Sequence, residues 1–169
     1  MKDNEKEMLP LVDEKGNLVG EAPRGVCHGG SMLLHPVVHL HVFNPHGELF
    51  LQQRPFWKDI QPSKWDTAVG GHMSPGETVE QALRREVKEE IGLENFEPEF
   101  VAQYVFESKK ERELVHVFRT TTHQTPLPSE ELADGRFFPF EEIKIRLHTH
   151  FFTPNFEEEF CRFFLREGI

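Results

Sequence analysis

The sequence predicts an α/β protein, and three observations support that class. Apolar and polar residues alternate over residues 37–43, which is typical of a strand, whereas residues 71–93 have the apolar spacing of a helix. Strand-like runs lie on both sides of that helix, and residues 141–166 have the pattern of a helical tail. Strands and helices interspersed in this way indicate an α/β domain and not an all-helical or all-β one.

Length, charge and composition narrow the class of protein. The 169 residues suit one domain spanning 1–169, and the net charge of −10 argues against a nucleic-acid groove, which requires a basic face. Two cysteines make no disulfide framework. The charged start lacks the apolar core of a signal peptide, and no apolar run approaches the roughly 18 residues of a membrane span. We therefore expect a cytoplasmic protein without membrane or nucleic-acid partners.

The first third of the chain predicts a hairpin and two strands. Residues 9–21 form the hairpin, with Gly16-Asn17 at its turn. An irregular stretch follows at 23–31. In the strand at 37–43 we expect Val38, Leu40 and Val42 on one face and two histidines on the other. A turn at 44–47 leads to a strand at 49–53, a loop at 54–64, and a segment at 65–70 that enters the helical region.

Residues 71–93 predict a loop, a helix and a helix stop. Ser74-Pro75-Gly76 is a turn signal, the helix opens at Glu77-Thr78, and Gly92 occupies the position of a C′ glycine. One helix face is a buried stripe made of Val79, Ala82, Leu83, Val87 and Ile91.

The last third predicts two strands, at 96–106 and 114–122, that pair around Lys109-Lys110, a short strand at 135–140, and helices at 141–147 and 155–166. This part of the chain is rich in phenylalanine, and most of these rings are expected in the core. The residues are Phe137, Phe138, Phe140, Phe151, Phe152, Phe156, Phe160, Phe163 and Phe164.

The polar face of the central helix carries Glu86, Glu89 and Glu90, three or four positions apart. Like charges at this spacing repel each other, and a divalent cation such as Mg²⁺, which prefers carboxylate oxygens, would remove the repulsion. Arg85 can pair with Glu77 at the helix start and so hold the loop against the helix. The alternative is a solvated acidic face without a metal.

The whole string resembles the Nudix box, G-x5-E-x7-R-E-U-x-E-E-x-G-U, where U is a bulky aliphatic residue. Every defined position is filled, by Gly71, Glu77, Arg85, Glu86, Val87, Glu89, Glu90, Gly92 and Leu93. The resemblance implies a Nudix fold, with a mixed sheet sandwiched between helices, and hydrolysis of a nucleoside diphosphate linked to another moiety, or of a related diphosphate, with Mg²⁺ or Mn²⁺. It also implies that Glu86, Glu89 and Glu90 hold metal and that the Gly71 carbonyl helps.

Histidines and two further carboxylates form a second candidate metal site. His28 and His35 lie seven positions apart, flanking an irregular segment at the mouth of a strand. His72 follows Gly71, and Glu111 and Glu113 share one face of a strand. Such a donor set suits Mn²⁺, Zn²⁺ or Fe²⁺, and the alternative is a group of loop histidines without metal.

Residues 25–118 also resemble the isopentenyl-diphosphate isomerase branch of the Nudix superfamily. The shared features are the five candidate ligands of the second site, together with R-x3-K at Arg54 and Lys58 and the sequence between Pro62 and His72. The resemblance implies that the five ligands hold one metal and that Arg54 and Lys58 contact the substrate diphosphate. The chain departs from the isomerases at Gly70, where they carry a catalytic cysteine, and in its complete box.

These features together predict a metal-dependent hydrolase of a small diphosphate. Glu86, Glu89, Glu90, Arg85 and Glu77 form the catalytic set, with Arg85 and Glu77 mainly structural. The general base is a box glutamate or a later carboxylate such as Glu130 or Glu131. An isomerase-like enzyme and a non-catalytic diphosphate sensor remain alternatives, and both a monomer and a homodimer are left open.

Overall fold

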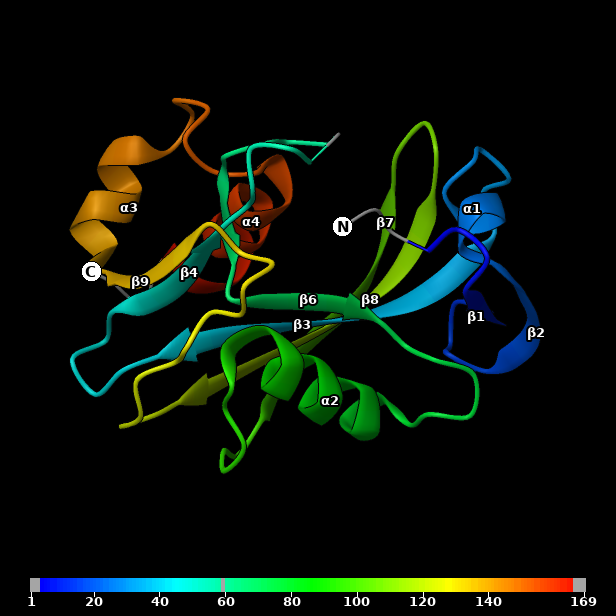
Figure 1. The fold of residues 1–169 in the computed structure, drawn as a ribbon, viewed down its shortest axis with the longest axis horizontal. Helices are drawn as coiled ribbons and strands as arrows, with labels where there is room; N and C mark the ends of the chain where they lie inside the picture. The colour runs from blue at the N-terminus through cyan, green and yellow to red at the C-terminus, as the bar shows by residue number, and fades with distance from the viewer. Residues whose placement is uncertain (1–3, 59, 166–169) are drawn as a thin grey trace. The chain divides into compact units, whose positions relative to one another are not determined.

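The computed structural model describes residues 4–58 and 60–165 (Figure 1). The chain divides into two compact units: the first is Met1–His39, Gly70–Glu86 and Phe100–Phe118, and the second is Leu40–Val69, Val87–Glu99 and Arg119–Ile169. Several strands and one helix run through both units. The single domain expected over 1–169 stays a prediction.

Nine strands and four α-helices are described, and they confirm the α/β class. The strands are β1 Met8–Val12, β2 Leu18–Pro23, β3 Leu34–Phe43, β4 Leu49–Gln53, β5 Trp65–Thr67, β6 Val69–His72, β7 Glu99–Glu107, β8 Arg112–Thr121 and β9 Asp134–Phe138. The helices are α1 Arg24–Cys27, α2 Val79–Ile91, α3 Phe140–Arg146 and α4 Pro154–Glu159, followed by a π-helix at Phe160–Phe164. A mixed sheet of seven strands has the order β5-β4-β3-β8-β7, with β6 paired to β3 and β9 paired to β4.

In the first unit, β1 and β2 form the predicted antiparallel hairpin (Figure 1). The Asp13 carboxylate accepts hydrogen bonds from the backbone N–H groups of Lys15 and Asn17, and Gly16 supplies the left-handed turn residue at φ 90°. The stretch predicted to be irregular contains the one-turn helix α1, which packs on β1 and β2. Four residues are too few to produce a helical periodicity in the sequence.

Strand β3 begins three residues earlier than predicted, so His35 lies within it. All of its residues except His39 are buried, which means that both faces of the strand are covered. Burial therefore follows the expected division only in part: His39 on the histidine face is half-buried, whereas His41 on the same face is fully buried.

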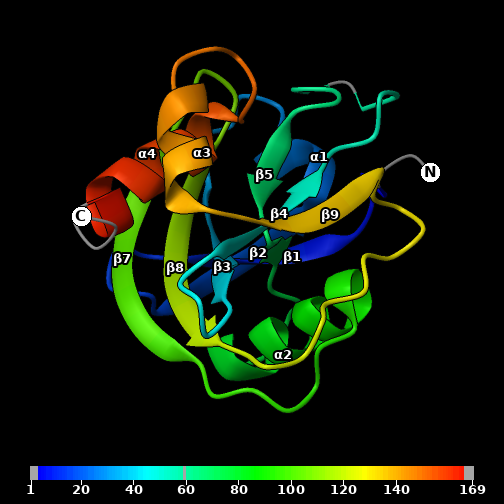
Figure 2. The ribbon, with the colours of Figure 1, turned by 90° about the vertical axis from the view of Figure 1, so that its left-hand side faces the viewer.

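The second unit contains the phenylalanine core that was expected. Strand β4 pairs antiparallel with β5 and with β9 (Figure 2). Five of the nine phenylalanine rings predicted for the core are fully buried, namely Phe138, Phe152, Phe156, Phe160 and Phe164. Among them lies a buried polar pair, in which His41 Nε2 and Glu159 Oε1 are 2.8 Å apart. The predicted helix at 155–166 is α4 plus the π-helix, and residue 166 lies outside the described residues.

None of the helices within the described residues is both long enough and apolar enough to cross a membrane.

Candidate active site

Helix α2 carries the three glutamates of the predicted metal site. Thr78 and Gln81 form a reciprocal capping box at its start, with each backbone N–H donating to the other side chain, at 3.0 and 3.1 Å. Gly92 ends the helix with φ 65° and donates its N–H to the Lys88 carbonyl. The helical period therefore places Glu86, Glu89 and Glu90 on one side of α2, as the sequence predicts.

The predicted pairing of Arg85 with Glu77 is confirmed. The guanidinium donates two hydrogen bonds to the Glu77 carboxylate, at 2.7 and 2.9 Å, and one to the carbonyl of His72 at 3.0 Å. Glu77 also accepts the N–H of Ser74 at 2.7 Å. The hydrogen bonds from Arg85 lower the pKa of Glu77 below its ordinary value, and those with Glu77 raise the pKa of Arg85. The loop before α2 is therefore tied to the helix by charged hydrogen bonds.

Glu86 lies directly over Gly71. A Cβ at position 71 would overlap the carboxyl group and the Cγ of Glu86, so this approach requires glycine. The carboxylate also contacts Arg85, whose Nη1 donates to Glu86 Oε1 at 2.8 Å. Glu86 is thus packed against the main chain at Gly71, and the shared metal contact expected of these two residues stays a prediction.

Glu90 is held by a residue that sequence reasoning missed. Gln52, buried on β4, donates from Nε2 to the Ala68 carbonyl at 3.1 Å and to Glu90 Oε1 at 3.3 Å. The carbonyl of Glu90 accepts the N–H of Ser129 at 2.8 Å. The exposed carboxylates of Glu130 and Glu131 follow in the next two positions, so the chain that carries these candidate bases is attached to the end of α2.

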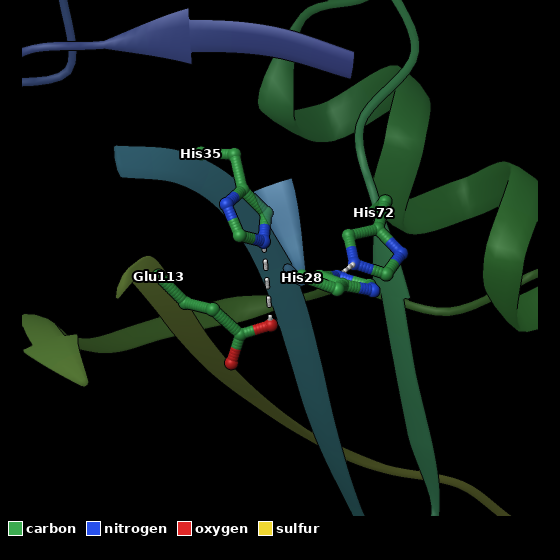
Figure 3. Close-up of side chains that lie close together, drawn as sticks. All are labelled: His28, His35, His72 and Glu113. Atoms are coloured by element: carbon green, nitrogen blue, oxygen red, sulfur yellow. Dashed lines mark hydrogen bonds and ion pairs between the residues drawn. The ribbon is translucent and has the colours of Figure 1, made fainter. Parts of the chain in front are cut away.

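The three histidines and two carboxylates of the second predicted site come together in the first unit. Figure 3 shows His28, His35, His72 and Glu113 pointing toward one another, and one ligand atom from each lies within 4.8 Å of all the others. His28 Nε2 is 3.1 Å from His72 Nε2 and 3.2 Å from Glu111 Oε2. Glu111 therefore borders the same cluster.

The donor chemistry of this cluster fits a transition metal. His35 is fully buried, its Nδ1 lies 3.1 Å from the Leu33 carbonyl, and its Nε2 has no hydrogen-bond partner among the described residues. Donation from Nδ1–H to the carbonyl leaves a lone pair on Nε2, directed toward Glu113 at 3.8 Å. Burial lowers the pKa of His35 and of His72, which favours the neutral imidazole that binds metals. Burial raises the pKa of Glu111.

Arg54 and Lys58 lie in the second unit, in the loop after β4. Arg54 donates from Nε to the Ile60 carbonyl at 3.1 Å and lies 3.5 Å from Asp66 Oδ2. Lys58 Nζ lies over the Trp57 ring, 5.3 Å from its centre. The diphosphate contact expected of this pair stays a prediction. At Gly70, the added Cβ of a larger residue would lie 3.3 Å from His39 Cδ2.

Comparison with known proteins identifies the family. The sequence model of the protein family described as NUDIX domain matches residues 33–160, which is most of the chain. The chain belongs to the Nudix family. Nudix proteins generally use divalent metals and bind small diphosphates, so the two clusters of donors described above have a family context.

Named relatives within the family fall into two groups. An isopentenyl-diphosphate Δ-isomerase 1 of Photorhabdus laumondii is 30% identical over 164 residues, which cover 92% of this chain and 93% of that protein. A protein of Streptomyces coelicolor named as an uncharacterized Nudix hydrolase is 31% identical over 153 residues, covering 88% of this chain and 83% of the relative. An isopentenyl-diphosphate Δ-isomerase of Corynebacterium efficiens is 37% identical over 91 residues, covering 54% of this chain and only 48% of that isomerase.

Solved structures agree with this Nudix fold. DR0079 from Deinococcus radiodurans has a TM-score of 0.80 and 25% identity, covering 94% of this chain and 99% of its own. A MutT protein from Methanosarcina mazei has a TM-score of 0.67 and 24% identity, covering 80% of this chain and 96% of its own, which shows the fold alone. The predicted Nudix fold is therefore confirmed.

Proposed function

We propose that this Nudix protein is a metal-dependent hydrolase that cleaves the diphosphate bond of a nucleoside diphosphate linked to another moiety, or of a related small organic diphosphate. The observation that carries the proposal is the box itself: Glu86, Glu89 and Glu90 share one side of α2, and the first of them is packed on Gly71. Carboxylates that share one helix side suit Mg²⁺ or Mn²⁺, which leave coordination positions for phosphate oxygens, and we propose that the Gly71 carbonyl helps to hold the ion.

The roles of the chain's own groups follow from their contacts. Arg85 and Glu77 hold the loop that follows Gly71 and β6, and Gln52 orients Glu90. When bound, a divalent ion would supply positive charge to the diphosphate and make a water molecule more acidic. A carboxylate then accepts the proton of the attacking water as it adds to phosphorus and the bridging oxygen leaves. A box glutamate, Glu130 and Glu131 are the candidates for this base.

Arg54 and Lys58 are proposed to bind the outer phosphate of the substrate. Both are basic residues, and a chain of net charge −10 requires local cations to attract an anionic substrate. The turn that joins them presents Phe56 and Trp57, which are 82% and 43% exposed. We propose that the leaving moiety lies toward these rings.

An isomerase is the second candidate, because a relative named isopentenyl-diphosphate Δ-isomerase aligns over 92% of the chain. Allylic isomerisation adds a proton at one carbon and removes one at another, so it requires a donor and an acceptor on opposite sides of the substrate. Gly70, where the resembling isomerases have cysteine, offers no side chain for proton transfer. Losing a positioned acid or base typically costs about 10²- to 10⁴-fold in rate, so we favour the hydrolase.

Two measurements separate the candidates. A panel of nucleoside diphosphate derivatives and short organic diphosphates, incubated with Mg²⁺ or Mn²⁺, is expected to release phosphate or a monophosphate product from at least one compound. Isopentenyl diphosphate incubated with the protein in heavy water is expected to show no deuterated dimethylallyl product by NMR. Formation of that product at an enzymatic rate would replace the hydrolase assignment with an isomerase.

The panel also tests the third alternative, a sensor that binds diphosphates without cleaving them. A sensor would bind a compound of the panel, as measured by calorimetry, but would release no product with either metal. Turnover of the bound compound that depends on Glu89 excludes the sensor.

A further inference from the structure

Strand β7 is an open edge of the seven-stranded sheet. It is the last strand in the order β5-β4-β3-β8-β7, and within the described part of the chain its sheet neighbour is β8 (Figure 2). None of its nine residues is buried, and Phe100 and Val105 are 58% and 37% exposed. At the other end of the order, β5 has only three residues.

Natural proteins usually protect a long open edge from pairing with another chain. Lysine, proline and bulges on the edge strand are common devices, and a very short edge strand is another. Strand β5 has the last of these, but the sequence EFVAQYVFE of β7 contains neither lysine nor proline. An edge of this length and composition is suited to pairing with a further strand.

The sequence of β7 shows which strand would fit. Read in either direction from Gln103, it presents nearly the same series of residues: Ala102 or Tyr104, then Val101 or Val105, then Phe100 or Phe106, then a glutamate. An antiparallel pair of two identical strands centred on one residue places each position opposite its mirror position. Such a pair has a two-fold axis, which is the most common symmetry of homodimers.

We propose that β7 is a dimer interface, at which two copies of this chain pair their β7 strands antiparallel about a two-fold axis at Gln103. Phe100 then lies opposite Phe106 of the second copy, and Val101 lies opposite Val105. Aromatic and β-branched pairs of this kind are among the favourable cross-strand pairs.

The remaining positions are also compatible with this register. The small Ala102 lies opposite the large Tyr104, so neither face is overfilled, and the two Gln103 amides meet at the axis. Glu99 lies opposite Glu107, which brings two like charges together at each end of the pair. Glu107 is partly compensated within its own chain, because Arg112 Nε is 3.0 Å from Glu107 Oε1, while the same guanidinium also pairs with Glu14 at 3.2 Å. One strand pair makes a small interface, so we expect a dimer that dissociates on dilution.

Sedimentation velocity of the full chain provides the first test. The wild type is expected to be a dimer that becomes monomeric on dilution. Val105→Glu is expected to be a monomer, because the new carboxylate faces Val101 of the second copy and lies diagonal to its Glu99. Ile145→Glu is the matched control, since Ile145 on α3 is 78% exposed and lies outside β7, and this variant should dimerise as the wild type does.

A second substitution of opposite charge distinguishes loss of the interface from a general effect on folding. Adding Val101→Lys to Val105→Glu places a lysine opposite each new glutamate across the axis, so the double variant is expected to dimerise again. A wild type that stays monomeric at every concentration would overturn the proposal. A dimer that persists in Val105→Glu, or a double variant that remains monomeric while folded, would overturn it as well.

Disulfide cross-linking tests the register itself. Opposite Cα atoms of an antiparallel pair lie roughly 4.5–5.5 Å apart, within the range that a disulfide spans. Gln103→Cys is therefore expected to form a covalent dimer under mild oxidation, whereas the two copies of Val105→Cys are held about 13 Å apart along the strands and should not. The wild type is the control for cross-linking through Cys161, because it contains Cys161 but no introduced cysteine. Equal cross-linking of the two variants would contradict this register.

Discussion

At the scale of single residues, the box glutamates are proposed to contribute to catalysis through their charge. Replacing Glu89 or Glu90 with glutamine keeps the size of the side chain and removes its charge, so turnover of the substrate found in the panel should fall by about 10²-fold or more. The fold should be retained, because like charges on one helix face repel each other. Steady-state kinetics and thermal unfolding measure the two effects.

Glu80→Gln is the matched control for these variants. Glu80 is an exposed glutamate on the same helix that pairs with Arg84 at 3.2 Å, and it is not part of the box. Its replacement should leave turnover within about twofold of the wild type. If Glu89→Gln and Glu90→Gln behaved like this control, the box would not be the catalytic site.

The histidine cluster also acts through individual atoms. The buried Nε2 of His35 has no hydrogen-bond partner within the described part of the chain, which costs about 1–3 kcal/mol, and metal coordination would offset that cost. Protein purified without chelator is expected to contain Mn, Fe or Zn by elemental analysis, and joint replacement of His28, His35 and His72 by alanine should remove it. His46→Ala, at an exposed turn, should retain the metal. Failure of the wild type to take up metal even after soaking would contradict the site.

At the scale of elements, the loop before α2 depends on the hydrogen bonds between Arg85 and Glu77. Glu77→Gln removes a charged acceptor, so the free energy of unfolding should fall by about 1–3 kcal/mol at neutral pH. Because the pKa of Glu77 is lowered from its ordinary 4.5, its contribution to stability is present above that pH and is lost as the pH falls through the lowered pKa.

Urea unfolding of wild type and Glu77→Gln at neutral and acidic pH measures this dependence. The difference between the two proteins should be largest near neutrality and should shrink below the ordinary pKa of a glutamate. The exposed control Glu80→Gln should show a small difference with little change over the same range. A constant difference for Glu77→Gln across this range would mean that the charge does not stabilise the loop.

At the scale of the whole molecule, local sequence patterns predicted most helices and strands. They did not predict contacts between segments that are far apart in the sequence. Strand β4 has the predicted bounds, and α2 has the predicted C′ glycine, because both depend on neighbouring residues. Helix α1 is too short for a period, and nothing in a helical pattern marks the π-helix at Phe160–Phe164. The hydrogen bond from Gln52 to Glu90 joins residues 38 positions apart, so no spacing rule reveals it.

The same limit applies to the candidate site. The contact of Arg85 with Glu77 follows from positions within one loop and helix, and it was predicted from the residues. The second cluster spans residues 28 to 113, and spacing suggested it only weakly. Resemblance to a family supplied what spacing could not, because a family pattern records which distant residues meet in the fold.

The close approach of Gly71 to Glu86 has a consequence for mutational tolerance. Every amino acid other than glycine adds a Cβ that displaces the Glu86 carboxylate, a flexible group that can move without disturbing the core. Gly71→Ala should therefore be as abundant and as thermally stable as the wild type but should lose most of its turnover. In a scan of all substitutions that scores cellular abundance and activity separately, position 71 should stand out by a wide gap between the two scores, whereas buried Leu83 should lose both together.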